Sequence, residues 1–171
     1  MTRSIFAIAA VFALSGCFGS APQDAGQMRT MSKSNVFGAQ TSYKVARSYN
    51  GVVASLRKGA NKCLNRNQIV RSTYRPGPMM APVSRQMVFY YSTTMKSGRG
   101  GTEMMMRKKF QGAKLIGGGA DNSGVFYLVD VKPASGGTVL NVYGGKIGYG
   151  ELNAAVKQWA SGGSIRCPEL P

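Results

Sequence analysis

Few side chains in this chain are able to carry chemistry near neutral pH. Its 171 residues include three cysteines and no histidine. The acids are Asp24, Glu103, Asp121, Asp130, Glu151 and Glu169, and no two of them form a recognisable catalytic motif. A Ser–Lys dyad remains open, because both residue types are plentiful and nothing marks one pair above another. We therefore predict that the protein is not an enzyme.

The first cysteine follows a segment that has the pattern of a secretion signal. Arg3 supplies a positive charge, and an apolar run of about ten residues, too short to span a bilayer, precedes Ser15. The sequence Leu14-Ser15-Gly16-Cys17 resembles the lipobox of bacterial lipoproteins. This resemblance covers residues 1–17 and implies cleavage before Cys17, a diacylglycerol on its thiol and a third acyl chain on its new amine. The alternative is an ordinary cleaved signal with an incidental cysteine.

Acylation of Cys17 would anchor the protein to a membrane without a transmembrane helix. Several acyl chains, each contributing about 0.8 kcal/mol per buried methylene, give stable attachment. Phe18 stands where an aspartate would resemble the signal that retains lipoproteins at the inner membrane. We expect a lipid-anchored outer-membrane protein that faces the periplasm, and the inner membrane is the less favoured alternative.

Cys63 and Cys167 form a pair once Cys17 is assigned to lipid. An exported protein folds in an oxidising compartment, where paired cysteines commonly become disulfides. Closing a loop of about 100 residues stabilises a fold by roughly 4–5 kcal/mol in the chain-entropy model. We predict a disulfide between Cys63 and Cys167 that joins the tail of the chain to the end of the first predicted helix. With no histidine and few acids, we predict no metal site and no cofactor.

The chain is strongly basic, with a formal net charge of +16. Removing the signal takes away Arg3 alone among the charged residues, so the mature charge remains far above zero and favours anionic partners. In an envelope these are lipid head groups, lipopolysaccharide phosphates, peptidoglycan carboxylates or an acidic protein, whereas export argues against nucleic acid. The densest basic run predicts a candidate anion-binding site, with a solvated sheet face as the alternative. Its residues are Arg107, Lys108, Lys109 and Lys114.

Methionines and glycines raise two further hypotheses, and we set both aside. Thioethers of Met79, Met80, Met87, Met95 and Met104–Met106 suit Cu(I), but methionine is also ordinary core filler, and we favour packing. Met105 is the exception to watch, because its neighbours on the same strand face are charged. Residues 117–119 are glycines but lack the Lys-Ser/Thr that completes a phosphate-binding P-loop.

The pattern of apolar residues predicts two helices and four strands. Residues 18–40 lack periodicity and are predicted to be a flexible tether, and a helix is predicted from Thr41 or Ser42 to near Leu64. After a break at residues 75–78, strands are predicted over 83–93, 102–110, 125–131 and 138–143, with turns at 97–101 and 135–137. Val125, Tyr127, Val129 and Val131 are predicted to share one strand face. A second helix is predicted over 150–161.

The element order α-β-β-β-β-α predicts an α+β fold. We expect a curved, four-stranded antiparallel sheet with both helices on one face. The predicted organisation is a signal at 1–16, an acylated cysteine and tether at 17–40, and one domain at 41–171. This element order resembles the helix-grip arrangement, which occurs in outer-membrane assembly lipoproteins such as the C subunit of the barrel-assembly machinery. The resemblance is in element order alone and implies nothing about individual residues.

Two functional hypotheses follow. The first is a non-catalytic, membrane-anchored envelope lipoprotein that acts as a scaffold or assembly subunit and binds another envelope protein. The second is a carrier or sensor that holds an anionic lipid or glycan between the sheet and the helices. A closed core with an exposed patch would favour the first, and an apolar cavity with basic residues at its mouth would favour the second.

Overall fold

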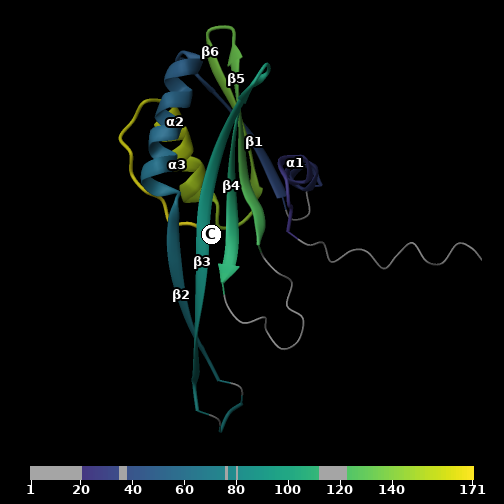
Figure 1. The fold of residues 1–171 in the computed structure, drawn as a ribbon, viewed down its shortest axis with the longest axis vertical. Helices are drawn as coiled ribbons and strands as arrows, with labels where there is room; N and C mark the ends of the chain where they lie inside the picture. Colours follow the sequence, from purple (N-terminus) through teal and green to yellow (C-terminus); the bar gives the residue numbers. More distant parts are fainter. Residues whose placement is uncertain (1–20, 35–37, 76, 80, 112–122) are drawn as a thin grey trace, which may run out of the picture.

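A computed structural model describes residues 21–34, 38–75, 77–79, 81–111 and 123–171. Over these residues the fold is α+β, as predicted, with three helices and one six-stranded antiparallel sheet (Figure 1). The strands lie in the order β1-β6-β5-β4-β3-β2, so β1 and β2 form the two edges. The strands are β1 (Gly38–Val45), β2 (Arg66–Tyr74), β3 (Val83–Gly98), β4 (Gly101–Gln111), β5 (Gly124–Ala134) and β6 (Gly137–Gly145).

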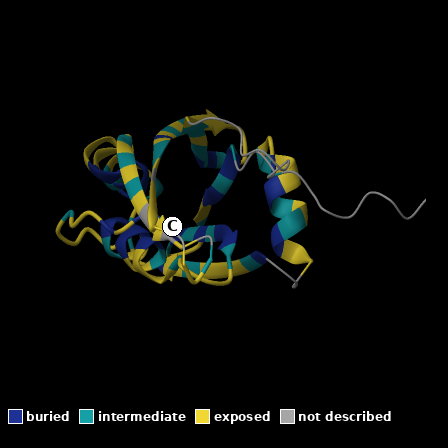
Figure 2. Cartoon of the chain, turned by 90° about the horizontal axis from the view of Figure 1, so that it is seen from below, coloured by how far each residue is buried: buried dark blue, intermediate teal, exposed yellow. Residues whose placement is uncertain are grey.

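Helices cover both faces of the sheet. Helices α2 (Tyr49–Cys63) and α3 (Gly150–Ala160) lie together on one face, and α1 (Ala25–Lys33) lies on the opposite face (Figure 1). Each helix turns one side toward the sheet, and the central strand β5 is buried on both of its faces (Figure 2). The prediction of two helices on one face is therefore right for α2 and α3 and misses α1.

Two separate apolar cores result from this arrangement. The larger core lies between the sheet and helices α2 and α3, and its fully buried members include Leu56, Met106, Leu140, Val156 and Trp159. The smaller core lies under α1 and contains Met28, Met105, Val125, Leu128 and Tyr143. Met105 therefore has an apolar environment, which α1 provides on a strand face that otherwise looks charged.

The predicted tether was wrong over part of its length. Asp24 caps α1 by accepting a hydrogen bond from the Gln27 amide at 2.8 Å, and Met28 is completely buried. Residues 38–40 belong to strand β1, which pairs along its whole length with β6. These segments carry too few apolar residues to show periodicity, but they become ordered because the sheet offers them partners.

The predicted start of the first long helix was also wrong. Thr41 and Ser42 lie in β1, and α2 begins at Tyr49, where the hydroxyl of Ser48 accepts a hydrogen bond from the Gly51 amide at 3.3 Å. Val45 fits the apolar spacing of a strand and of a helix equally well, because it lies two residues after Tyr43 and seven before Val52. The predicted end near Leu64 is confirmed, because α2 ends at Cys63 and Leu64 caps it.

The sheet has six strands where four were predicted. The missing strands are the edges, β1 and β2, whose sequences GAQTSYKV and RNQIVRSTY are mostly polar. An edge strand needs few apolar side chains, because one side of its backbone and much of its surface face water. The predicted turns at 97–101 and 135–137 are confirmed, and Gly136 adopts the left-handed conformation (φ 72°) that its turn requires.

A bulge changes the predicted faces of β5. Met106 pairs with Tyr127 and Arg107 pairs with Val125, so Phe126 is the extra residue. As a result Val125 lies in the core under α1, while Tyr127, Val129 and Val131 lie in the core under α2 and α3. The prediction that Val125 shares their face was wrong. Phe126 instead packs against Tyr91, with ring centroids 5.4 Å apart.

Candidate functional site

The three described residues of the predicted anion site, Arg107, Lys108 and Lys109, do not converge. The guanidinium of Arg107 donates to the main-chain oxygen of Gln23 at 2.6 Å, and Lys109 is exposed on the strand face that Arg107 shares. Lys108 points to the opposite face, where its ammonium lies 4.3 Å from the ring centroid of Phe89. Lys114 lies outside the described residues. The strand pleat thus separates Lys108 from its two neighbours.

The side chain of Lys108 is partly buried and packs beside the larger core. Its ammonium donates to the main-chain oxygen of Pro171 at 3.1 Å, and the same oxygen accepts from the hydroxyl of Tyr91 at 2.9 Å. Burial of the ammonium lowers the pKa of Lys108, because desolvation disfavours the charged form. This lysine therefore holds residues at the tail of the chain against β3 and β4.

Three of the acids serve to hold α1 on the sheet. Arg29 of α1 forms a two-pronged ion pair with Asp130, at 2.5 and 2.9 Å, and a third contact with Glu103 at 2.6 Å. The hydrogen bond to Asp130 is the main reason that the pKa of Arg29 is raised. Asp24 caps the same helix. Within the described residues, no three His, Cys, Asp or Glu side chains are grouped to hold a metal ion.

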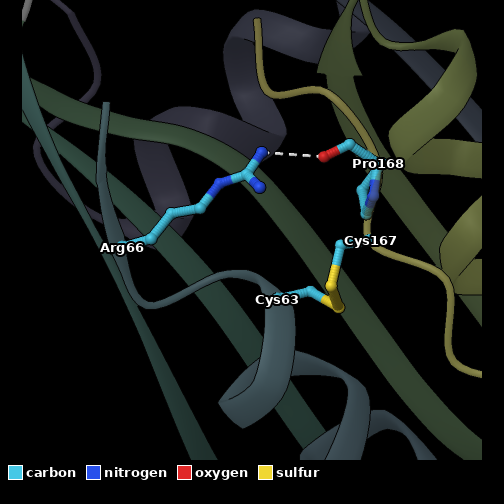
Figure 3. The surroundings of a disulfide bond; sticks show 4 residues. All are labelled: Cys63, Arg66, Cys167 and Pro168. Atoms are coloured by element: carbon cyan, nitrogen blue, oxygen red, sulfur yellow. Dashed lines mark hydrogen bonds between the residues drawn. A yellow bond between two sulfur atoms is a disulfide. The ribbon is translucent and has the colours of Figure 1, made fainter. Parts of the chain in front are cut away.

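The tail is fixed by the disulfide between Cys63 and Cys167, as predicted (Figure 3). Cys63 is buried at the end of α2, and the two Cα atoms are 5.0 Å apart. Beside the bond, the guanidinium of Arg66 donates to the main-chain oxygen of Pro168 at 2.8 Å. The tail is thus attached both to the end of α2 and to the start of β2.

The most prominent exposed feature is a hairpin arm formed by β2 and β3. It extends well beyond the other elements (Figure 1). Strand β4 pairs with β3 only from Val88 onward. The outer half of the arm, Val70–Tyr74 against Val83–Met87, is therefore two-stranded among the residues that the structure describes.

Exposed apolar side chains concentrate on this arm. In the described part of the chain, five large apolar side chains are exposed, and four of them belong to β2, β3 or the turn between these strands. Ile69 is 56% exposed, and Tyr90 lies on the same strand face, which is opposite to α2 and α3. The four are Ile69, Met79, Val83 and Tyr90.

All charged residues of the arm are basic. No acidic residue occurs anywhere between Asp24 and Glu103, a stretch that includes α2 and the whole arm. Arg71 and Arg75 are exposed on the arm, and Arg66 lies at its base. Strand β2 is a sheet edge, so one row of its backbone N–H and C=O groups has no strand partner within the described residues. Apolar, cationic and backbone hydrogen-bonding groups are thereby presented together.

Part of the hairpin arm could be predicted from the sequence. The break at residues 75–78 and the strand from Val83 were predicted, and a turn between two strands makes a hairpin. Strand β2 was not predicted, because polar residues interrupt the alternation of apolar and polar side chains that is typical of a strand. These residues are Asn67, Gln68, Ser72 and Thr73. The acid-free stretch from 25 to 102 is readable from sequence alone and would have marked the arm as cationic.

The predicted lipidation site, Cys17, lies outside the described residues. None of the described helices has the length and apolar character that a bilayer span requires. Comparison with models of protein families, with curated proteins and with solved structures gave no match.

Proposed function

We propose that this protein is a membrane-anchored, non-catalytic binding subunit of the bacterial envelope, and that it recruits an acidic segment of another envelope protein through the β2–β3 arm. The observation that carries the proposal is the arm itself, which projects from the body with exposed apolar and basic side chains and no acids. Exposed apolar side chains that gather on one projecting element beside polar groups favour a protein interaction site.

The outer half of the arm is the part most in need of a partner. An isolated two-stranded hairpin is at best marginally stable in water, because it has no third strand or helix to cover it. In the described residues, neither face of the pairs from Val70↔Met87 to Tyr74↔Val83 is covered by a helix. A bound partner segment would supply the missing strand or cover.

The chemistry of the edge favours a protein partner over a lipid surface. The free side of β2 offers backbone donors and acceptors at strand spacing, and an extended peptide satisfies these groups whereas acyl chains do not. The basic side chains beside this edge, Arg66, Arg71 and Arg75, attract an acidic segment and disfavour a basic one. The occupant that fits both properties is an extended acidic strand.

The arm is tested with two charge-matched variants. Ile69→Glu places a carboxylate on the exposed face of β2, and Ser42→Glu does the same on β1, the opposite edge of the sheet. We expect Ile69→Glu to weaken binding of the partner by about ten-fold or more, since burying an unpaired charge is costly, and Ser42→Glu to leave it unchanged.

The partner is first identified by photocrosslinking from position 69 in intact cells, and binding is then measured with the purified partner. A crosslink from position 69 to an acidic segment of a protein whose binding is weakened by Ile69→Glu supports the proposal. Equal binding by both variants contradicts it, as does crosslinking to lipid alone.

Membrane anchoring through Cys17 is tested separately. Cys17→Ser should leave the protein unprocessed or soluble, because the thiol that accepts the diacylglycerol is gone. Mass spectrometry of the mature N-terminus and membrane fractionation are the measurements. Normal processing and unchanged membrane association in the variant would exclude the anchor without bearing on the arm.

The ligand-carrier alternative has no specific observation in its favour. The side chains between the sheet and the helices α2 and α3 are fully buried, including Trp159, Tyr127, Leu56, Met104 and Leu152. A cavity large enough to hold a ligand there would leave its lining accessible to solvent-sized probes. Two grooves of the described residues, of about 490 and about 530 Å³, lie elsewhere.

A further inference from the structure

A groove of about 530 Å³ lies beside helices α2 and α3 and shares no residue with the arm. One wall is a face of α2, and the other is the segment that follows α3. Its volume is in the range of small-molecule sites. The side chains that matter for its chemistry are Ser55, Lys58, Lys62, Trp159, Ser164 and Ile165.

The groove is positively charged and has no compensating acid. Lys58 and Lys62 are exposed and one helical turn apart, so both ammonium groups border the same groove. None of the residues that line it is acidic. An ammonium group donates hydrogen bonds and accepts none, so the groove suits a ligand that supplies negatively charged acceptors.

Two serine hydroxyls are arranged to donate as well. Ser55 Oγ accepts a hydrogen bond from the guanidinium of Arg47 at 3.2 Å, and Ser164 Oγ accepts one from the side-chain amide of Gln158 at 3.1 Å. Because each oxygen already accepts, each hydroxyl proton is available to an outside acceptor. The groove therefore presents two hydroxyl donors together with the two ammonium groups.

Trp159 also lines the groove, and its side chain is completely buried. Its indole nitrogen has no hydrogen-bond partner among the described residues and almost no accessible surface, so a ligand in the open groove does not reach it. The ring borders the groove, and its emission can report on a bound ligand.

The second wall, which is the segment that follows α3, is held in place at both of its ends. The guanidinium of Arg47 donates to the main-chain oxygen of Ala160 at 2.8 Å at the end of α3, and the disulfide fixes Cys167 to the end of α2. Gly162 has the left-handed φ of 83°, and a Cβ there would lie 2.9 Å from the Arg47 guanidinium. The segment between these points is thereby held beside Lys58 and Lys62.

We propose that this groove binds the phosphate group of a small phosphorylated ligand, such as a sugar phosphate or a phosphorylated lipid head group. Phosphate oxygens would accept from the two lysines and the hydroxyls, and the apolar side chain of Ile165 would contact the remainder of the ligand. A volume of about 530 Å³ exceeds what bare phosphate needs. The site uses no residue of the arm, so it stands or falls independently of the proposed function.

Trp159 provides the measurement, because it is the only tryptophan in the chain. The full-length protein in phosphatidylcholine vesicles is titrated with glucose 6-phosphate, inorganic phosphate or glucose, and its emission is followed. We expect a saturable change with glucose 6-phosphate, a weaker response to phosphate and none to glucose. Including phosphatidylglycerol in the vesicles tests whether a lipid head group is the source of the phosphate.

Charge-matched variants decide where the ligand binds. Lys58→Glu/Lys62→Glu should weaken binding by about ten-fold or more, whereas Lys33→Glu/Lys44→Glu, which makes the same change at exposed positions of α1 and β1, should not. Circular dichroism confirms that each variant is folded.

The outcomes are distinguishable. A response to glucose 6-phosphate, or to phosphatidylglycerol alone, that is lost in Lys58→Glu/Lys62→Glu supports the site and identifies the source of the phosphate. Equal responses to glucose and glucose 6-phosphate overturn the proposal. So does binding that survives in the groove variant, or the absence of a response to every phosphate-bearing probe.

Discussion

Gly59 shows how a single residue allows the two helices of the larger core to approach. A Cβ at this position would lie 2.4 Å and 2.5 Å from ring carbons of Trp159, which is completely buried. Gly59→Ala should therefore destabilise the fold by about 1–3 kcal/mol, because overpacking outweighs the better helix propensity of alanine. The measurement is the free energy of unfolding in urea. Gly150→Ala is the control, since a Cβ there meets nothing within 4 Å, and an equal loss in both variants would refute this role of Gly59.

Tyr127 is one of the buried tyrosines that should make stability fall at alkaline pH. Burial raises the pKa of Tyr127 well above its ordinary value of 10, and its hydroxyl donates to Asn153 at 2.8 Å. A raised pKa in the folded state means that the unfolded chain loses this proton first. The stabilisation is therefore complete below about pH 10 and declines as the pH rises further.

Tyr127→Phe separates the two contributions of this side chain. At neutral pH the variant should lose about 0.5–1.5 kcal/mol, because the hydrogen bond to Asn153 is gone. Above about pH 10 its stability should fall less steeply than that of the wild type, because the titrating group has been removed. Urea unfolding at about pH 7 and about pH 11 measures both effects. Parallel pH profiles for the two proteins would contradict this account.

At the scale of elements, α1 depends on one arginine. The Asp130 carboxylate that pairs with Arg29 is only 12% exposed, whereas the arginine is 33% exposed and screened by solvent. Arg29→Met should destabilise the docked helix by about 1–2 kcal/mol, because Asp130 and Glu103 lose their cation. Trypsin should then cleave faster after Lys33. Lys44→Met, an exposed change on β1, should leave this rate unchanged, and an unaltered rate in Arg29→Met would contradict a role of the ion pair in holding the helix.

The elements also show which patterns are local and which are not. Helix α3 and the turns at 97–101 and 135–137 were predictable, because apolar spacing and glycine act within a few residues. The bulge at Phe126 was not predictable, because it depends on how β5 aligns with β4 across a separate part of the chain. The face of Val125 follows from that alignment and not from its own position in sequence.

At the scale of the whole molecule, the disulfide links two segments that are 104 residues apart. The double variant Cys63→Ser/Cys167→Ser should lose roughly 4–5 kcal/mol, because the unfolded chain gains the freedom that a loop of about 100 residues otherwise denies it. Calorimetry of the oxidised and substituted proteins measures this loss. Non-reducing mass spectrometry of the native protein provides the control. Two free thiols there, or an unchanged melting temperature in the variant, would contradict a structural role.

The candidate functional surfaces were less predictable than the covalent framework. The basic run at Arg107–Lys109 was visible in the sequence, but the pleat of β4 sends Lys108 to the helix side and leaves Lys109 on the other. The groove beside Lys58 and Lys62 needed the tail to return to α2, and no local pattern encodes that return. Charge is local to a residue, whereas a site requires several residues to meet.

The sequence by itself determined the α+β class, the last helix and the hairpins of the central strands, because apolar periodicity and turn glycines act locally. It also determined the Cys63–Cys167 pairing, because these two thiols were left once Cys17 was assigned to lipid. Only the tertiary structure decided that the polar segments at 38–45 and 66–74 are strands, that α1 covers the second face, and that β2 and β3 project as an arm. An edge strand and a short amphipathic helix acquire their structure from the surface that they join, since their own side chains bury too little to order them alone.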